Sequence, residues 1–138
     1  MKFFTTVFIV SLFFIAGKVT AQNSTITATV TNATTDEGKI SYALYTKDNF
    51  RKEPVLAKSS KIIKGESTVV FENVPEGEYA IICFHDKNNN NKMDFQPNGM
   101  PIEDYGVSTN NMNRFGPPQY DQIKFLVDDK NVSLEIKF

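Results

Sequence analysis

Acidic and amide side chains between residues 86 and 94 have the spacing of a calcium-binding loop. Asp86, Asn88, Asn90 and Asp94 stand at relative positions 1, 3, 5 and 9, and Lys92 offers its backbone carbonyl at position 7. Calcium takes about 6 to 8 oxygen ligands at roughly 2.3 to 2.6 Å, so a tightly curled chain can direct alternate oxygens to one centre. The sequence therefore predicts a calcium site in this loop.

The last ligand of such a site has to come from outside the loop. Position 12, which usually supplies a bidentate carboxylate, is Pro97, so we expect Glu103 or Asp104 to fold back and supply it. Position 6 is Asn91 in place of glycine, and asparagine tolerates the left-handed backbone of a sharp turn. The small number of carboxylates predicts weak affinity, about 10⁻⁴ to 10⁻³ M. An asparagine-rich turn satisfied by its own hydrogen bonds is the alternative.

Other chemistries have weaker support in the sequence. His85, the only histidine, precedes Asp86, but no nucleophile frame such as Gly-x-Ser-x-Gly accompanies the pair. One histidine and one cysteine are too few for a typical zinc site. Glu103 and Asp104 are adjacent, and adjacent carboxylates seldom face each other across a sugar. We therefore expect no enzyme. The alternative is a small envelope hydrolase of polysaccharide or esters that uses His85, Glu103 or Asp104 as acid or base.

The elements around this loop are predicted to be strands. Apolar and polar residues alternate with period two in six segments, and no segment after residue 21 has a helical period. This pattern predicts an all-β fold, an antiparallel β-sandwich. The segment 79–84 is apolar on both faces and is the expected central strand, with Cys83 packed as a small apolar side chain. The six segments are 25–31, 40–45, 67–74, 78–85, 122–127 and 132–138.

Two connections interrupt the alternation. Residues 46–61 are charged and are expected to hold only a short edge strand around 55–57. Residues 86–121 form a 36-residue segment without an obvious strand or helix, yet aromatic and methionine residues recur through it. We therefore expect one long ordered loop over the sandwich. Its aromatics Tyr105, Phe115 and Tyr120 are expected either to pin the loop or to bind a ligand.

The start of the chain predicts export. Lys2, the apolar run 3–16 and the small residues Val19 and Ala21 form a secretory signal peptide over residues 1–21. The run is too short for a membrane-spanning helix, so we expect a periplasmic or extracellular protein without stable membrane insertion. Residues 22–138 then form a single domain with 13 basic and 16 acidic residues, a balance that does not favour nucleic acid as a partner. One cysteine allows no internal disulfide.

The order of motifs resembles a known bacterial family. The motifs are Phe-His-Asp-Lys-Asn-Asn-Asn at 84–90, Met-Asp at 93–94, Asn-Gly-Met-Pro-Ile-Glu-Asp-Tyr-Gly-Val-Ser at 98–108, Gly-Pro-Pro at 116–118 and Val-Pro-Glu-Gly-Glu-Tyr-Ala at 74–80. They are similar to an exported family catalogued as domain of unknown function number 2141. The resemblance implies a β-sandwich, prealbumin-like or carboxypeptidase-regulatory-like, and no activity; an immunoglobulin-like sandwich is the other form that the strand pattern allows. It places Asp86, Asn88, Asn90, Asp94 and Glu103 at motif positions; Asn91 replaces the usual glycine.

Taken together, these features predict an exported, non-enzymatic binding or structural module with a calcium-stabilised loop. The expected ligand is a protein or a carbohydrate. A subunit of an envelope assembly is a further alternative.

Overall fold

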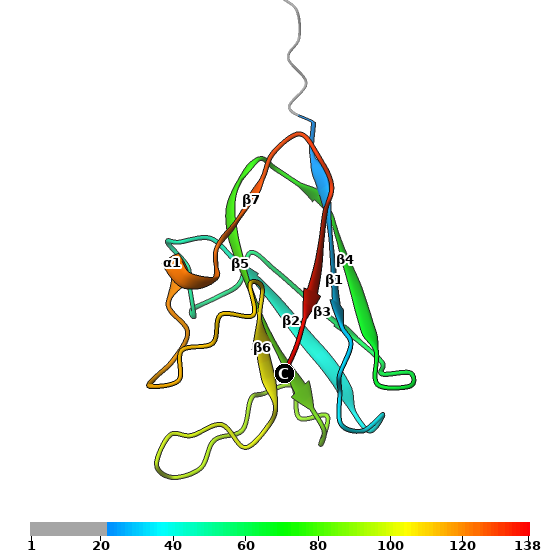
Figure 1. Cartoon of the computed structure of the whole chain (residues 1–138), viewed down its shortest axis with the longest axis vertical. Helices are drawn as coiled ribbons and strands as arrows, with labels where there is room; N and C mark the ends of the chain where they lie inside the picture. Colours follow the sequence, from blue (N-terminus) through cyan, green and yellow to red (C-terminus); the bar gives the residue numbers. More distant parts are fainter. Residues whose placement is uncertain (1–21) are drawn as a thin grey trace, which may run out of the picture.

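A computed structural model describes residues 22–138, so the predicted signal peptide lies outside the described residues (Figure 1). Two sheets pack face to face. One contains, in spatial order, β4 (Ser67–Val74), β1 (Ser24–Val30) and β8 (Val132–Ile136). The other contains β3 (Leu56–Ser60), β2 (Lys39–Tyr45), β5 (Gly77–Asp86) and β6 (Tyr105–Val107), with β7 (Phe125–Val127) also paired to β5.

The predicted β-sandwich is confirmed, with one parallel pair in it. Every strand pair is antiparallel except β1 with β8. The reason lies in the preceding strand: β7 belongs to the other sheet, so the chain crosses between sheets and enters β8 in the direction of β1. The expected central strand is β5, which pairs with β2 on one side and with β6 and β7 on the other.

The core lies between the sheets and follows the predicted alternation. On β2, Ile40, Tyr42 and Leu44 are almost completely buried, while the residues between them are half-buried on the outer face. Cys83 is completely buried on β5, and burial raises the pKa of its thiol. Cys83 therefore packs as a small apolar side chain, as expected. The core also contains Ile81 of β5 and, from the other strands, Ile26, Ala28, Val30, Val69, Phe71, Val74, Val127 and Ile136.

Two segment predictions need correction. The expected strand 122–127 is a short helix, α1 (Tyr120–Ile123), followed by the three-residue β7. The expected strandless loop 86–121 contains β6 and the first two residues of α1. Both elements are too short to show a period in sequence. The edge strand expected near 55–57 is confirmed as β3, which extends to Ser60.

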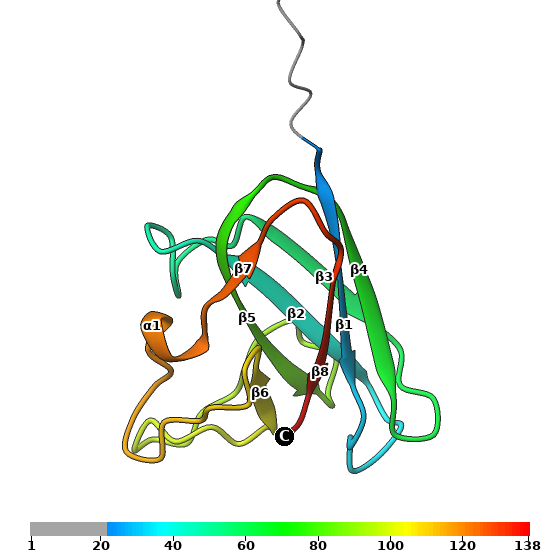
Figure 2. The ribbon, with the colours of Figure 1, turned by 45° about the horizontal axis from the view of Figure 1, so that its top comes forward.

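The long loop is ordered, as predicted, because it builds a second apolar cluster outside the five-stranded sheet. Ala80 of β5 packs there with Val107, Tyr120 and Ile123, supported by Phe50. The rings of Phe50 and Tyr120 meet edge to face at 5.4 Å between centroids. Figures 1 and 2 show α1 on the side of β5 opposite the β4-β1-β8 sheet. This four-residue helix is the only helix of residues 22–138, and none in that range is long and apolar enough to cross a membrane.

The buried Tyr42 hydroxyl predicts a fall in stability at alkaline pH. It donates to the carbonyl of Ser67 at 2.8 Å, and burial raises the pKa of Tyr42 from 10.0 to about 12. Between these values the unfolded chain loses the proton first, so unfolding becomes easier as pH rises. Urea unfolding should show a loss of about 2 kcal/mol from pH 10 to pH 12 through this residue. Tyr42→Phe should flatten that slope; an unchanged slope would contradict the assignment.

Candidate functional site

The loop predicted to bind calcium begins at the end of the central strand. Asp86 is the last residue of β5 and is completely buried. Its Oδ1 accepts the backbone N–H of Asn90 at 3.0 Å, and its Oδ2 accepts that of Asn91 at 2.9 Å. A buried carboxylate is costly unless it is hydrogen-bonded, so these two bonds both satisfy Asp86 and curl the chain around it.

The curl requires left-handed backbone at two asparagines. Asn89 has φ of 56° and Asn91 has φ of 63°, a region in which asparagine is several-fold enriched among non-glycine residues. The left-handed backbone expected at position 6 is therefore confirmed. Gly38 packs against the start of the loop, where an added Cβ would lie 2.1 Å from the carbonyl oxygen of Asp86. Only glycine fits this contact.

Glu103 folds back to the loop and joins its two ends. Its side chain is 7% exposed, and its two carboxylate oxygens accept the backbone N–H of Lys87 at 3.2 Å and of Asp94 at 3.1 Å. Asp104 points elsewhere, to the Lys87 ammonium at 3.5 Å and the Thr34 hydroxyl at 3.3 Å. Of the two residues considered for the last position, Glu103 is thus the one at the loop.

Within the loop, amide nitrogens face the remaining carboxylate. The carboxamide of Asn88 donates to Asp94 at 2.8 Å, and that of Asn90 donates to both Asp94 oxygens at 3.0 and 2.9 Å. The amide oxygens accept the backbone N–H of Asn90 and of Lys92. These bonds match the alternative of a self-satisfied asparagine turn. In residues 22–138, no three His, Cys, Asp or Glu side chains gather closely enough to hold a metal by themselves.

Lys39 is a member of the site that the sequence analysis missed. It pairs with Asp86 across β2 and β5, and its ammonium lies 3.9 Å from Asp86 Oδ2 and donates to the side-chain oxygen of Asn91. Only the strand register shows that this lysine, at the start of β2, lies beside Asp86 at the end of β5. Among the ion pairs of residues 22–138, the pair with Lys39 is the one that involves the buried carboxylate of Asp86.

His85 is placed where a substrate has no access. Its ring is completely buried, stacks on Phe138 with 6.4 Å between centroids, and uses Nε2 on the carbonyl of Glu37 at 2.7 Å. Its Nδ1 is buried without a hydrogen-bond partner in the described part of the chain. A general base must reach the proton that it removes, so this position does not favour catalysis by His85.

The Glu103 bridge predicts an asymmetry between two neighbouring carboxylates. Glu103→Gln keeps the shape but replaces one acceptor oxygen by a donor that faces a backbone N–H, so it should lower the free energy of unfolding by about 1 to 3 kcal/mol. Asp104→Asn is the matched control and should cost less than about 1 kcal/mol, because its ion pair with Lys87 is exposed. Urea unfolding measures both. Equal effects would show that Glu103 does not hold the loop.

Comparison with solved structures gives a distant likeness to a larger protein. Two structures of "Pilus-presented adhesin, Spy0125 (Cpa)" match at 11% identity with TM-scores of 0.29 and 0.31. A cysteine-to-alanine mutant of the same adhesin matches at 13% with a TM-score of 0.30. The matches cover 87% of this chain but only 28%, 27% and 28% of the adhesin chains, so the chain spans less than a third of that protein. Likeness at this level says nothing about ligands.

Sequence comparison places the chain in a family. No curated protein matches it in sequence. A family model matches residues 28–135, which contain the complete loop with Asp86, Asp94 and Glu103. This match covers most of the chain and confirms the resemblance seen in the motifs. The chain belongs to the family described as "Uncharacterized protein conserved in bacteria (DUF2141)".

Proposed function

We propose that this protein is an exported, non-enzymatic binding or structural module whose long loop is stabilised by calcium. The observation that carries the proposal is that hydrogen bonds tie three carboxylates, two of them buried, to one nine-residue loop. Asp86 and Glu103 are buried and Asp94 is half-buried, and they lie at the start, the closure and the end of the loop. As the loop stands they do not group closely enough to hold a metal by themselves; calcium, which prefers such oxygen ligands, would have to draw them together.

The donor set fits calcium by type. Asp86, Asp94 and Glu103 would supply carboxylate oxygens, Lys92 its carbonyl, and Asn88 and Asn90 their amide oxygens. The two amides would have to turn over, because their nitrogens face Asp94 when hydrogen bonds alone close the loop. Half a turn of the carboxamide exchanges its oxygen and nitrogen. Bound calcium would neutralise the carboxylates and cross-link the loop.

Weak affinity follows from what calcium has to displace. The Asn88 and Asn90 hydrogen bonds to Asp94 would be lost, and the Lys39 ammonium beside Asp86 opposes a second cation. Both effects make the free energy of calcium binding less favourable. An affinity in the range of about 10⁻⁴ to 10⁻³ M suits the extracellular space, where export would place the protein.

The positions of the reactive groups support a non-enzymatic role. The side chains of His85 and Glu103 are buried and committed to contacts within the fold, whereas Asp104 is half-exposed and paired with the Lys87 ammonium and the Thr34 hydroxyl. Hydrolysis of polysaccharide or esters would need an acid or base within reach of a substrate. His85 and Glu103 do not meet this condition, and Asp104 is already engaged in an ion pair with Lys87.

Calcium should raise the melting temperature. A ligand that binds only the folded state stabilises it by RT ln(1 + [L]/Kd), which is about 1 to 3 kcal/mol at 10 mM calcium for the expected affinity. Scanning calorimetry of the purified protein in 10 mM calcium and in excess chelator measures the difference. Asp94→Asn should abolish it, whereas Asp129→Asn, an exposed carboxylate in another turn, should leave it intact. Equal midpoints for the unmodified protein would refute the calcium proposal.

Removing the Lys39 ammonium should have the opposite effect to removing a ligand. Lys39→Met keeps the aliphatic part of the side chain but takes away the charge that lies 3.9 Å from Asp86. We expect calcium affinity to rise several-fold, because one unit charge near a surface pair changes the interaction by about 1 kcal/mol. Calorimetric titration of Lys39→Met and of Lys58→Met, whose ammonium bonds the Val70 carbonyl, provides the comparison. Equal calcium affinities of the two variants would show that the Lys39 ammonium does not oppose calcium binding.

A second role, as a subunit of an envelope assembly, is favoured by the apolar tips of the long loop. Phe115 is 99% exposed, and three other apolar side chains of the loop are more than half exposed: Phe95, Met100 and Ile102. Exposed apolar groups of this kind often contact a partner. Phe115→Ser should leave the melting temperature unchanged but weaken any such association.

A further inference from the structure

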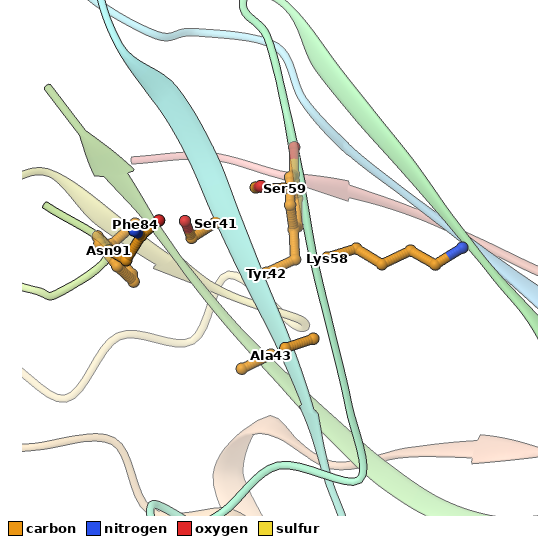
Figure 3. Close-up of a pocket in the computed structure, with 8 residues that line it drawn as sticks. Ser41, Tyr42, Ala43, Lys58, Ser59, Phe84 and Asn91 are labelled. Carbon is orange, nitrogen blue, oxygen red and sulfur yellow. The ribbon is translucent and has the colours of Figure 1, made fainter. Parts of the chain in front are cut away.

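Only part of the outer face of the five-stranded sheet is covered. The second apolar cluster covers the part around Ala80 and Val107. The remainder, nearer the acidic loop, forms a shallow concavity of about 320 Å³ (Figure 3). Eight residues from β2, β3, β5 and the acidic loop line it; besides Tyr42 and Lys58 they are Ser41, Ala43, Ala57, Ser59, Phe84 and Asn91.

The strand register explains how these residues share one surface. Ser41 lies opposite Ser59 on β3 and opposite Phe84 on β5, so a hydroxyl, a second hydroxyl and an aromatic ring form one row. Ala43 and Ala57 form the next row and keep the floor low. Figure 3 shows Phe84 and Asn91 together on one side of Ser41. The result is a low, open floor with a ring at one end.

The polar groups of this floor are free to bind. Among the hydrogen bonds of residues 22–138, none involves the hydroxyl of Ser41 or Ser59, whereas the neighbouring Ser60 hydroxyl donates to a carbonyl. Asn91 uses its side-chain oxygen on Lys39, which leaves its amide N–H groups as donors. The half-buried Phe84 ring offers an apolar face beside them.

The charges beside the concavity are already paired: the Lys39 ammonium, next to Asn91, lies 3.9 Å from Asp86. Lys58 contributes to its border, but its ammonium points away and donates to the carbonyl of Val70 on β4. Figure 3 shows the Lys58 side chain directed away from Phe84 and Asn91. A charged ligand would find no unpaired opposite charge here, and a wholly apolar one would bury unpaired hydroxyls.

We infer that this concavity is a binding subsite for a neutral saccharide. A pyranose ring has apolar C–H groups that can lie on the Phe84 ring and hydroxyls that both donate and accept, which matches two serines and an amide. The volume is at the small end of ligand sites, roughly 300 to 1,000 Å³, so one or two sugar rings suit it. The inference rests on the proposed binding role but not on calcium, because Asp86 and Lys39 already hold Asn91 in place.

Titration of the isotope-labelled protein with disaccharides tests the inference. Maltose, cellobiose and N,N′-diacetylchitobiose serve as probes, each added in chelator and in 10 mM calcium while backbone amide signals are recorded. At least one probe should give saturable shifts at Ser41, Ser59, Phe84 and Asn91, with a dissociation constant on the order of 1 to 10 mM for so open a site. No saturable shift with any of the three, or shifts only elsewhere, would overturn the inference.

Matched variants separate binding from folding. Phe84→Leu keeps an apolar side chain but removes the ring and should weaken binding at least about tenfold; Phe115→Leu, which removes an exposed ring outside the concavity, should not. Ser59→Ala should weaken binding and Ser133→Ala, on the other sheet, should not. Equal effects within either pair would overturn the inference. Sugar shifts without any calcium effect on melting would refute the calcium proposal alone, and the reverse result would refute the subsite alone.

Discussion

The rest of the site depends on how two buried carboxylates hold backbone amides. Asp86 ends the central strand and accepts two N–H groups from the loop that follows, while Glu103 accepts the N–H groups at both ends of that loop. A buried carboxylate destabilises the fold by several kcal/mol unless such bonds satisfy it. Movement of the loop would break these bonds and is therefore unfavourable. The bonds replace the disulfide that a single cysteine cannot form.

From this anchor the chain builds two surfaces. His85 N–H bonds the carbonyl of Asp104, which brings the returning segment alongside the strand that it left, and β6 continues the sheet there. The rest of the segment folds over the outer face and buries Tyr120 and Ile123. It covers only part of that face. The uncovered remainder, bordered by Asn91, is the concavity, so one anchored loop both stabilises the sheet and limits the site on it.

The sequence predicts the sandwich well because alternation over seven or eight residues, as in β1 and β4, has one physical cause: one face is buried. It also predicts the left-handed backbone of Asn91 and the return of either Glu103 or Asp104, because both follow from residue types in or near the loop; only the structure distinguishes the two carboxylates. It cannot predict β6 or α1, which have three and four residues and depend on tertiary packing, as Gly106 against Ile136 shows. Lys39 and the Ser41 to Phe84 row depend on strand register, which one sequence does not contain.

Calcium is the cation proposed for the loop. In its absence, hydrogen bonds close the loop and the Lys39 ammonium lies beside Asp86. A crystal structure of the protein grown in 10 mM calcium tests this most directly, because anomalous scattering identifies the ion. We predict one calcium ion bound by Asp86, Asn88, Asn90, the carbonyl of Lys92, Asp94 and Glu103, with both amides turned so that oxygen faces the ion. A loop without the ion, with Asn88 and Asn90 still donating to Asp94, would contradict the account.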